Sequence, residues 1–322
     1  MKISSPFERL VRASRNAQKR SPFRPIKPMK KLNRKRVYKP KTLGNPRISF
    51  PASMQNMMKG LSSALSRITR KTPTEDYDAV IRGFLPTNAK VLAPQFPRDS
   101  GRYVFADLDG DSQKELVTTY RLNDLNVTMA LKKQGGQWMK VAEYAAVSED
   151  SLNFTGAANI TGGGREQLLL GWKTKENRGE LQAYSLHNGQ LNQLFKHAYN
   201  HMEVLPSSNR QASNPSQLAL WNLNARGVYD VALKEWNGSE IVDAKNQTTY
   251  YHSHVLPYYG RMVKKMPQNP SNWYGMAVAL EKAGMDRDAL TAVEMASRYN
   301  PTASNLQELS ALKERLVEKL KT

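Results

Sequence analysis

The residues best suited to chemistry in this chain are four acidic side chains within one short stretch: Asp107, Asp109, Asp111 and Glu115. At alternate positions of a tight loop, their carboxylates offer four hard oxygen ligands of the kind that Ca²⁺ prefers. The same stretch can equally be a structural turn, because an Asp-Gly pair connects strands well and aspartate side chains accept hydrogen bonds from nearby backbone N–H groups. The residues leave both interpretations open.

No enzyme motif accompanies this loop. The sequence contains no nucleophile elbow, Walker loop, dinucleotide-binding fingerprint or HExxH helix, and the absence of cysteine excludes thiol catalysis and Cys-ligated metals. His197 and His201 are four residues apart, and His252 and His254 would share one side of a strand. Neither histidine pair has acidic neighbours that would complete a metal shell. We therefore predict a protein that is not an enzyme, with catalysis on a propeller scaffold as an alternative.

An internal repeat indicates how the loop is positioned. Residues 106–121 align with residues 158–173 at an offset of 52, and residues 216–223 align with the second halves of both. Each segment is followed by a strand-like run, a tight turn and another strand. About four strands in each repeat of roughly 50 residues are typical of propeller blades. The predicted turns are Gly135-Gly136, Asn188-Gly189 and Asn237-Gly238.

The apolar pattern within the first repeat predicts strands with one buried face. Val127, Met129 and Leu131 alternate with Thr128, Ala130 and Lys132, as in a half-buried strand.

The run from Phe105 to Asp111, followed by Glu115-Leu116-Val117, resembles the FG-GAP or VCBS repeat of β-propellers, and the resemblance extends over residues ~100–250. It implies a propeller-like β-domain and, because such loops often bind calcium in that family, a Ca²⁺ ion at the four acidic residues. Only three units are recognisable, although residues 78–97 can add a partial blade or an edge strand. An open array would need its edges covered by the arm, the C-terminal helices or another subunit, so an oligomer is compatible with it.

Residues 270–301 resemble one tetratricopeptide repeat, and residues 257–266 and 304–320 are predicted to form flanking helices. These helices can dock on the β-domain or present a peptide-binding face. The predicted packing positions of the repeat include Trp273, Gly284, Ala289, Ala296 and Pro301.

The net charge of +20 lies almost entirely in an N-terminal arm. Residues 1–71 contain 20 basic residues and one acid, a net charge of +19, which leaves +1 for the remainder. Residues 21–49 are proline-rich, so we expect them to be extended or disordered. Residues 52–70 are predicted to form an amphipathic helix that can contact the folded body, a membrane or a partner. Such an arm indicates a polyanion as partner: nucleic acid, an anionic membrane or a wall polymer. The residues predicted to bind it are Lys30, Lys31, Arg34, Lys35, Arg36, Lys39 and Lys41.

Together these patterns predict an α+β protein with three parts: a basic arm (1–75), a propeller-like antiparallel β-domain (76–255) and a helical cap resembling a tetratricopeptide repeat (256–322). The predicted function is that of a non-enzymatic scaffold, tethered to a polyanion and bound to a protein partner through its repeats. No apolar run reaches the ~18 residues of a membrane span, and the N-terminus lacks the apolar core of a secretory signal. We expect a cytoplasmic protein, in contact with a membrane surface if the polyanion is lipid. A calcium-binding protein of the cell envelope is the alternative.

Overall fold

The computed structural model describes residues 75–97, 100–148, 150–174, 178–206, 215–299 and 303–321. The predicted polyanion-binding residues of the arm, the predicted helix over residues 52–70 and Pro301 all lie outside these ranges.

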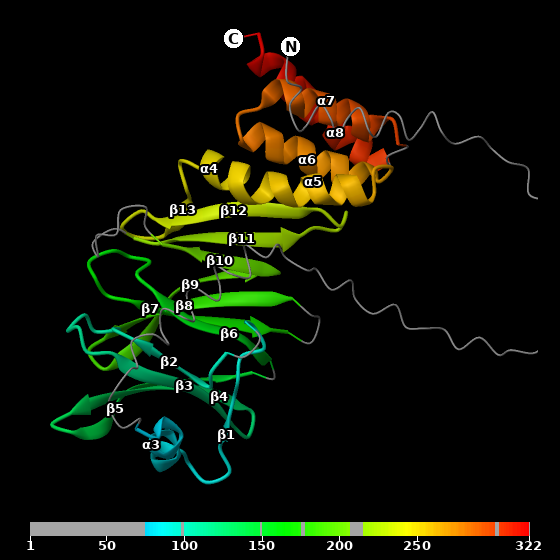
Figure 1. Cartoon of the computed structure of the whole chain (residues 1–322). Helices are drawn as coiled ribbons and strands as arrows, with labels where there is room; N and C mark the ends of the chain where they lie inside the picture. The colour runs from blue at the N-terminus through cyan, green and yellow to red at the C-terminus, as the bar shows by residue number, and fades with distance from the viewer. Residues whose placement is uncertain are drawn as a thin grey trace, which may run out of the picture. The chain divides into compact units, whose positions relative to one another are not determined.

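Thirteen described strands form three antiparallel sheets, and helices follow them in the chain (Figure 1). The prediction of an α+β protein with antiparallel sheets is therefore confirmed. The first sheet (sheet A) has the order β1-β3-β4-β5 with β2 also paired to β3, the second (sheet B) has the order β6-β7-β8-β9, and the third (sheet C) has the order β10-β11-β12-β13. The strands are β1 (Lys90–Val91), β2 (Tyr103–Ala106), β3 (Glu115–Leu122), β4 (Leu125–Gln134), β5 (Gln137–Val147), β6 (Ser151–Ala158), β7 (Gln167–Lys173), β8 (Gly179–His187), β9 (Gln190–Tyr199), β10 (His201–Leu205), β11 (Gln217–Leu223), β12 (Tyr229–Trp236) and β13 (Ile241–Asp243).

The predicted turns join the third and fourth strands of each sheet. Gly135-Gly136 and Asn188-Gly189 have positive φ at both central residues, as the tightest hairpins require. The third turn is built differently: only Gly238 has positive φ, and the Asn237 side chain accepts hydrogen bonds from the N–H groups of Ser239 and Glu240. All three predicted hairpins are confirmed.

The central strands are buried on both faces, so the prediction of half-buried strands is wrong. In β4 the residues on both sides are buried, including Thr128, Ala130 and Lys132. In β3, Val117 packs toward sheet B, whereas Leu116 and Tyr120 pack on the opposite face. Each sheet therefore requires a cover on both faces.

Sheets A, B and C cover one another in chain order. Leu168, Leu170 and Trp172 of β7 share a core with residues of sheet A, while Leu169 shares a second core with Leu218 and Leu220 of β11. Backbone hydrogen bonds join the layers at equivalent places: Glu166 donates to the carbonyl of Asp107, and Ser216 donates to that of Asn159.

A helix covers the outer face of sheet A. In α3 (Tyr77–Phe84), Asp76 caps the first turn and Ile81 is 2% exposed in a core with Leu116, Tyr120 and Met129. Residues 78–97, for which we predicted a partial blade or an edge strand, thus begin with most of this helix and continue as irregular chain and the short strand β1. The edge-strand prediction holds for β1 alone, which pairs with β3.

The C-terminal helices begin at Thr248, ahead of the predicted boundary at 256. The first three segments form one continuous helical stretch whose central part is a π-helix. His252 and His254 lie in that π-helix, so the prediction that they share one side of a strand is wrong. The helices are α4 (Thr248–Tyr250), η1 (Tyr251–Val255), α5 (Leu256–Lys265), α6 (Pro270–Lys282), α7 (Asp286–Ser297) and α8 (Ala303–Lys319).

Tyrosine side chains attach this helical stretch to sheet C. The Trp221 indole donates to the Tyr250 hydroxyl (2.8 Å), and the Tyr251 hydroxyl donates to the Val231 carbonyl (2.6 Å). The Tyr259 hydroxyl accepts from the backbone N–H of Tyr229 (2.9 Å) and donates to its carbonyl (3.1 Å). The helices therefore dock on the β-domain, one of the two predicted roles.

The predicted packing positions of α6 and α7 are buried. Trp273, Ala289 and Ala296 have no exposed surface, and Gly284 adopts positive φ in the turn between the helices. In α8, Leu309, Leu312 and Leu316 are buried, whereas Leu306 and Leu320 are exposed. The pattern thus identified buried packing positions of α6 and α7.

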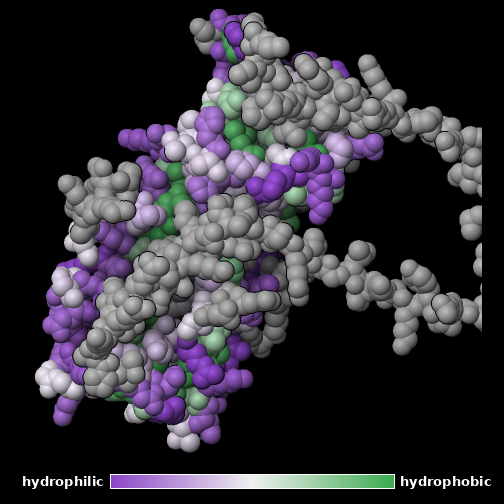
Figure 2. Space-filling model, viewed as in Figure 1, coloured by the Kyte–Doolittle hydropathy of each residue, from purple (hydrophilic) through white to green (hydrophobic). Residues whose placement is uncertain are grey.

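On the face shown in Figure 2, the surface of the described residues is largely hydrophilic, with smaller hydrophobic areas visible between the hydrophilic side chains. Among the described residues, no helix combines the length and apolar character that a membrane span requires.

Close packing of α5 against α6 depends on Gly275, because a Cβ atom there would lie 2.2 Å from the Tyr259 ring. We predict that Gly275→Ala lowers the free energy of unfolding by about 1–3 kcal/mol through overpacking. Gly83→Ala is the matched control, since a Cβ at Gly83 of α3 meets nothing within 4 Å and alanine favours helix by roughly 0.5–1 kcal/mol. Urea unfolding measures both variants, and equal stability of the two would contradict this packing.

An ion-pair network joins α6 to α8, since Glu281 bonds Arg315 (2.8 and 2.9 Å) and Lys319 (2.8 Å). The Arg315 contact, with help from Lys319, lowers the pKa of Glu281 to about 2. Because the pKa of Glu281 is lower in the folded state than in the unfolded state, its ionisation stabilises the fold at pH values above the unfolded-state pKa. This stabilisation is lost as the pH falls from about 4.5 toward 2.

We predict that Glu281→Gln destabilises the protein by about 2 kcal/mol at pH 7, a figure discounted for the half-exposed Arg315 and Lys319. The difference from wild type should shrink as the pH falls below about 4.5. Thermal unfolding between pH 2.5 and pH 7 measures this, with Glu294→Gln on the exposed face of α7 as control. A difference that does not depend on pH would refute the assignment.

Candidate functional site

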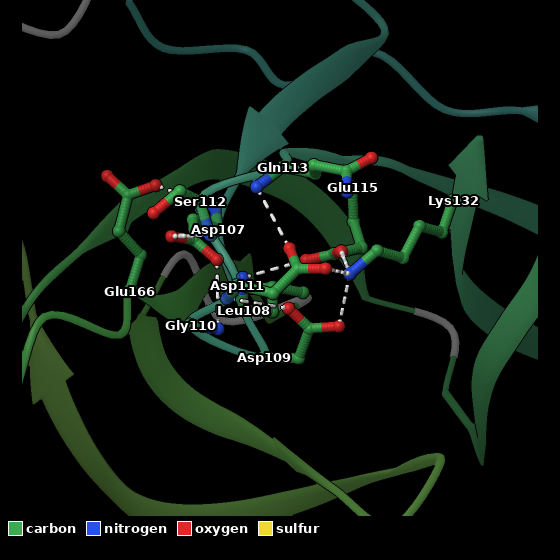
Figure 3. Close-up of polar contacts among 10 residues, drawn as sticks. All are labelled: Asp107, Leu108, Asp109, Gly110, Asp111, Ser112, Gln113, Glu115, Lys132 and Glu166. Carbon is green, nitrogen blue, oxygen red and sulfur yellow. Dashed lines mark hydrogen bonds and ion pairs between the residues drawn. The ribbon is translucent and has the colours of Figure 1, made fainter. Parts of the chain in front are cut away.

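The acidic loop connects β2 to β3 at the end of sheet A nearest the second repeat (Figure 3). Gly110 and Ser112 adopt positive φ within it, so Ser112 takes the backbone conformation that glycine adopts most readily. The structure brings the four predicted site residues together, and one oxygen each of Asp107, Asp109 and Glu115 lie within 4.8 Å of one another.

Backbone N–H groups occupy about half of the carboxylate oxygens. Asp107 accepts from Gly110 and Ser112 through its two oxygens, at 2.9 and 3.0 Å. One oxygen of Asp109 accepts from the N–H of Asp111, and one oxygen of Asp111 accepts from the N–H of Gln113. These bonds are those of the structural turn that the sequence allowed.

Glu115 closes the loop from the first position of β3. Its side chain has no exposed surface, and its Oε2 accepts from the Leu108 N–H at 2.8 Å. A second acid, Glu166, reaches the loop from the second repeat and accepts from the Asp107 N–H at 2.9 Å.

Lys132, a residue that the sequence analysis did not identify as part of the site, places its ammonium among the remaining oxygens. It contacts Asp109 Oδ2, lies 2.7 Å from Asp111 Oδ2, and lies 3.1 Å from Glu115 Oε1 in an ion pair outside hydrogen-bond geometry (Figure 3). The Lys132 side chain is only 6% exposed. The acidic loop is therefore a salt-bridge cluster around one buried cation.

The charges of the cluster depend on one another. Burial acts to lower the pKa of Lys132, but the contacts of its ammonium with three carboxylates outweigh this effect, and the pKa is raised. The same ammonium lowers the pKa of Asp111. Glu115 behaves oppositely: burial raises its pKa, although the Leu108 N–H and Lys132 oppose this effect. Lys132 therefore stays charged at neutral pH, and its ammonium opposes the rise that burial causes in the pKa of Glu115.

The second and third sheets carry different residues at the equivalent positions. In sheet B, Gln167 takes the place of Glu115 and accepts from the N–H groups of Ile160 and Thr161 (2.6 and 3.0 Å). Lys132 comes one residue after Leu131, which pairs with Leu116 in sheet A. Ser185 comes one residue after Tyr184, which pairs with Leu168 in sheet B, so Ser185 takes the place of Lys132. In sheet C, Gln217 donates to Glu235 at 2.8 Å. The lysine occurs only where the loop is acidic.

The residues as arranged do not fit a calcium ion. Ca²⁺ requires six to eight oxygen ligands at about 2.3–2.6 Å. Asp107 uses both oxygens for N–H groups, and the oxygens of Asp109, Asp111 and Glu115 that remain face the Lys132 ammonium. A divalent ion would have to displace a cation that is already paired three times.

A shallow recess of about 270 Å³ opens beside the cluster. It is bordered by Asp109 and Arg165 on one side and by the turn between β8 and β9 on the other, with His187 and Asn188. Its lining is mainly polar, and it lies open at the surface beside the loop.

The two histidine pairs lie elsewhere. His197 is in β9 and His201 in β10, so both lie in strands. Neither these histidines nor His252 and His254 join a set of three metal-ligating side chains within the part of the chain that the structure describes.

A second buried polar cluster lies between sheet C and the helices. His201 Nε2 and Glu203 Oε1 are 3.4 Å apart, both side chains are less than 10% exposed, and Glu203 Oε2 has no hydrogen-bond partner. The prediction that neither histidine pair has an acidic neighbour is therefore wrong for His201. Burial first, and then the charge of Glu203, raise the pKa of Tyr250, whose ring stacks on His254. The junction between β-strands and helices is thus covered by four buried tyrosines, Tyr250, Tyr251, Tyr258 and Tyr259.

Comparison with known proteins adds no identification: no family model matches the chain, and no curated protein matches it. The resemblances to FG-GAP or VCBS repeats and to a tetratricopeptide repeat stay predictions.

We predict that Glu115→Gln destabilises the protein by about 2 kcal/mol, because Lys132 loses its most deeply buried counter-charge while the Leu108 N–H keeps an acceptor. Urea unfolding at pH 7 measures the loss. The control is Glu166→Gln, which removes a carboxylate beside the same loop. The Glu166 side chain is 28% exposed and pairs with the exposed Lys114, so we expect this substitution to destabilise the protein by less than about 1 kcal/mol. Equal effects of the two substitutions would contradict a buried ion cluster centred on Lys132.

Proposed function

We propose that this chain is a non-enzymatic interaction protein, tethered to a polyanion by its basic arm and bound to a protein partner through its β and helical repeats. The observation that carries the proposal is the separation of charge: a net charge of +19 in residues 1–71 beside +1 in the other 251 residues. A nearly neutral body has little electrostatic affinity for polyanions, so the arm supplies the attachment.

The expected attachment depends strongly on salt. Each arm cation that meets a phosphate releases a condensed counterion, and log K falls with log salt by about 0.7–0.9 for each contact. The densest cluster, from Lys30 to Arg36, is the part of the arm expected to contribute most. We expect the protein to be in the cytoplasm and to bind there to the exposed surface of its polyanion.

The architecture of the body supports the binding role. Each sheet contains a run of four antiparallel strands consecutive in the chain, which is how propeller blades are built. We propose that the three sheets are blade-like units in an open array. Helices cover the outer faces of its first and last sheets, whereas in a ring these two sheets would pack on each other. The helix pair α6–α7 would act as a single tetratricopeptide-like unit docked on this array.

The chemistry of the charged clusters also favours binding over catalysis. Lys132 pairs with three carboxylates of the acidic loop, and Arg315 and Lys319 pair with Glu281. These groups are engaged in structural ion pairs, and catalytic acids and bases need a different arrangement, with free access to a substrate.

The test is deletion of residues 1–49. We predict that the full chain is retained on nucleic acid or on anionic phosphatidylserine vesicles at 50 mM salt and released at high salt, and that the deleted chain is not retained. Nuclease treatment distinguishes the two polyanions. Undiminished retention of the deleted chain would refute tethering by the arm.

A matched pair of variants separates arm charge from total charge. Replacing five arm cations by glutamine should reduce the slope of log K against log salt by about 4, whereas replacing five cations of the body should leave it unchanged. The arm set is Lys30, Lys31, Arg34, Lys35 and Arg36, and the body set is Lys133, Lys173, Lys245, Lys264 and Lys265.

A further inference from the structure

We infer that Lys132 is the resident cation of the acidic loop: its ammonium stands where a divalent metal would be held, so the native loop needs no metal. Removing this one side chain is then expected to leave three carboxylate oxygens able to bind Ca²⁺, with water completing the coordination of the ion. This inference concerns the β-domain alone and does not depend on the proposed function.

The first argument is charge balance in a confined space. Asp107, Asp109, Asp111 and Glu115 place four carboxylates within one loop, and Glu115 has no exposed surface. Carboxylates at this spacing repel one another unless a cation lies between them. Lys132 provides that cation at 6% exposure, where water competes little for its contacts.

The second argument is the division of the carboxylate oxygens. The oxygens that do not receive N–H bonds belong to Asp109, Asp111 and Glu115, and all three converge on Lys132 Nζ (Figure 3). Glu115 Oε1 is buried, accepts no hydrogen bond, and has the ammonium at 3.1 Å. Without the ammonium this oxygen would be a buried, unpaired charge, which is costly enough to favour capture of another cation.

The third argument comes from the repeat itself. At the position equivalent to Lys132, sheet B has Ser185, and at the positions equivalent to the acids it has Asn159, Thr161, Gly163 and Gln167. The acids and the lysine are thus absent together. If the acids served only as turn residues, their absence from sheet B would not need to be accompanied by the absence of the lysine on the neighbouring strand.

The experiment uses the full chain with Lys132→Met, which keeps much of the side-chain volume and removes the charge. Lys133→Met is the control, because it removes the same charge from the next residue of β4, which is exposed. Melting temperatures are measured at constant ionic strength in EDTA, in millimolar CaCl₂ and in millimolar MgCl₂, and Ca²⁺ binding is measured by calorimetry.

For the wild type and for Lys133→Met, we expect the melting temperature of each protein to be the same with Ca²⁺ as without it. Lys132→Met should melt lower in EDTA, and saturating Ca²⁺ should raise its melting temperature by about 5–10 °C. Two results would overturn the inference: a saturable stabilisation of the wild type by Ca²⁺ that Asp109→Asn removes, or a Lys132→Met variant that neither loses stability in EDTA nor binds Ca²⁺.

A second variant decides the outcome if Lys132→Met folds in neither buffer. The double variant Glu115→Gln, Lys132→Ser installs the uncharged pair that sheet B uses. Recovery of a cooperative melt in EDTA would show that uncompensated charge caused the unfolding and would support the inference, whereas continued failure to fold would overturn it.

Discussion

Burial of each sheet on both faces is the constraint on which the described structure depends. Leu116 and Val117 point to opposite sides of β3 and are both fully buried, and Leu168 and Leu169 do the same in β7. A sheet of this kind is stable only between two covers. The chain meets this requirement by stacking its sheets on one another, by placing α3 on the first, and by placing the tyrosine-rich stretch from Thr248 to Lys265 on the last.

The same constraint explains why an ion cluster is found at the edge of this stack. Lys132 and Glu115 lie where the paired strands β3 and β4 pass from the buried core to the acidic loop, so neither side chain can reach water freely. A buried charge is tolerated when several partners surround it. Three carboxylates around one ammonium meet that condition, and Glu166 binds the loop to the next layer of the stack.

Much of this fold could be predicted from local sequence. The 52-residue offset and the Gly-containing turns indicated the strand order, and the spacing of Trp273, Ala289 and Ala296 indicated helix packing, because these signals depend on near neighbours. Lys132 was missed because its partners are set by the register of β3 against β4, which local sequence does not specify. One signal was available: a lysine directly follows the apolar run of β4, and the aligned second repeat lacks both that lysine and the acids. The helix α3 and the helical start at Thr248 were missed because both segments pack on the outer faces of sheets A and C. These long-range contacts are not visible in the local sequence.

The central claim is that an ammonium group takes the place of a metal at the acidic loop. The most direct test is a high-resolution crystal structure of the wild-type protein grown with 10 mM CaCl₂. The account predicts that Lys132 Nζ lies within hydrogen-bond distance of Asp109, Asp111 and Glu115, with no anomalous peak between them. A calcium ion bound by these carboxylates, with Lys132 turned away from the loop, would contradict it.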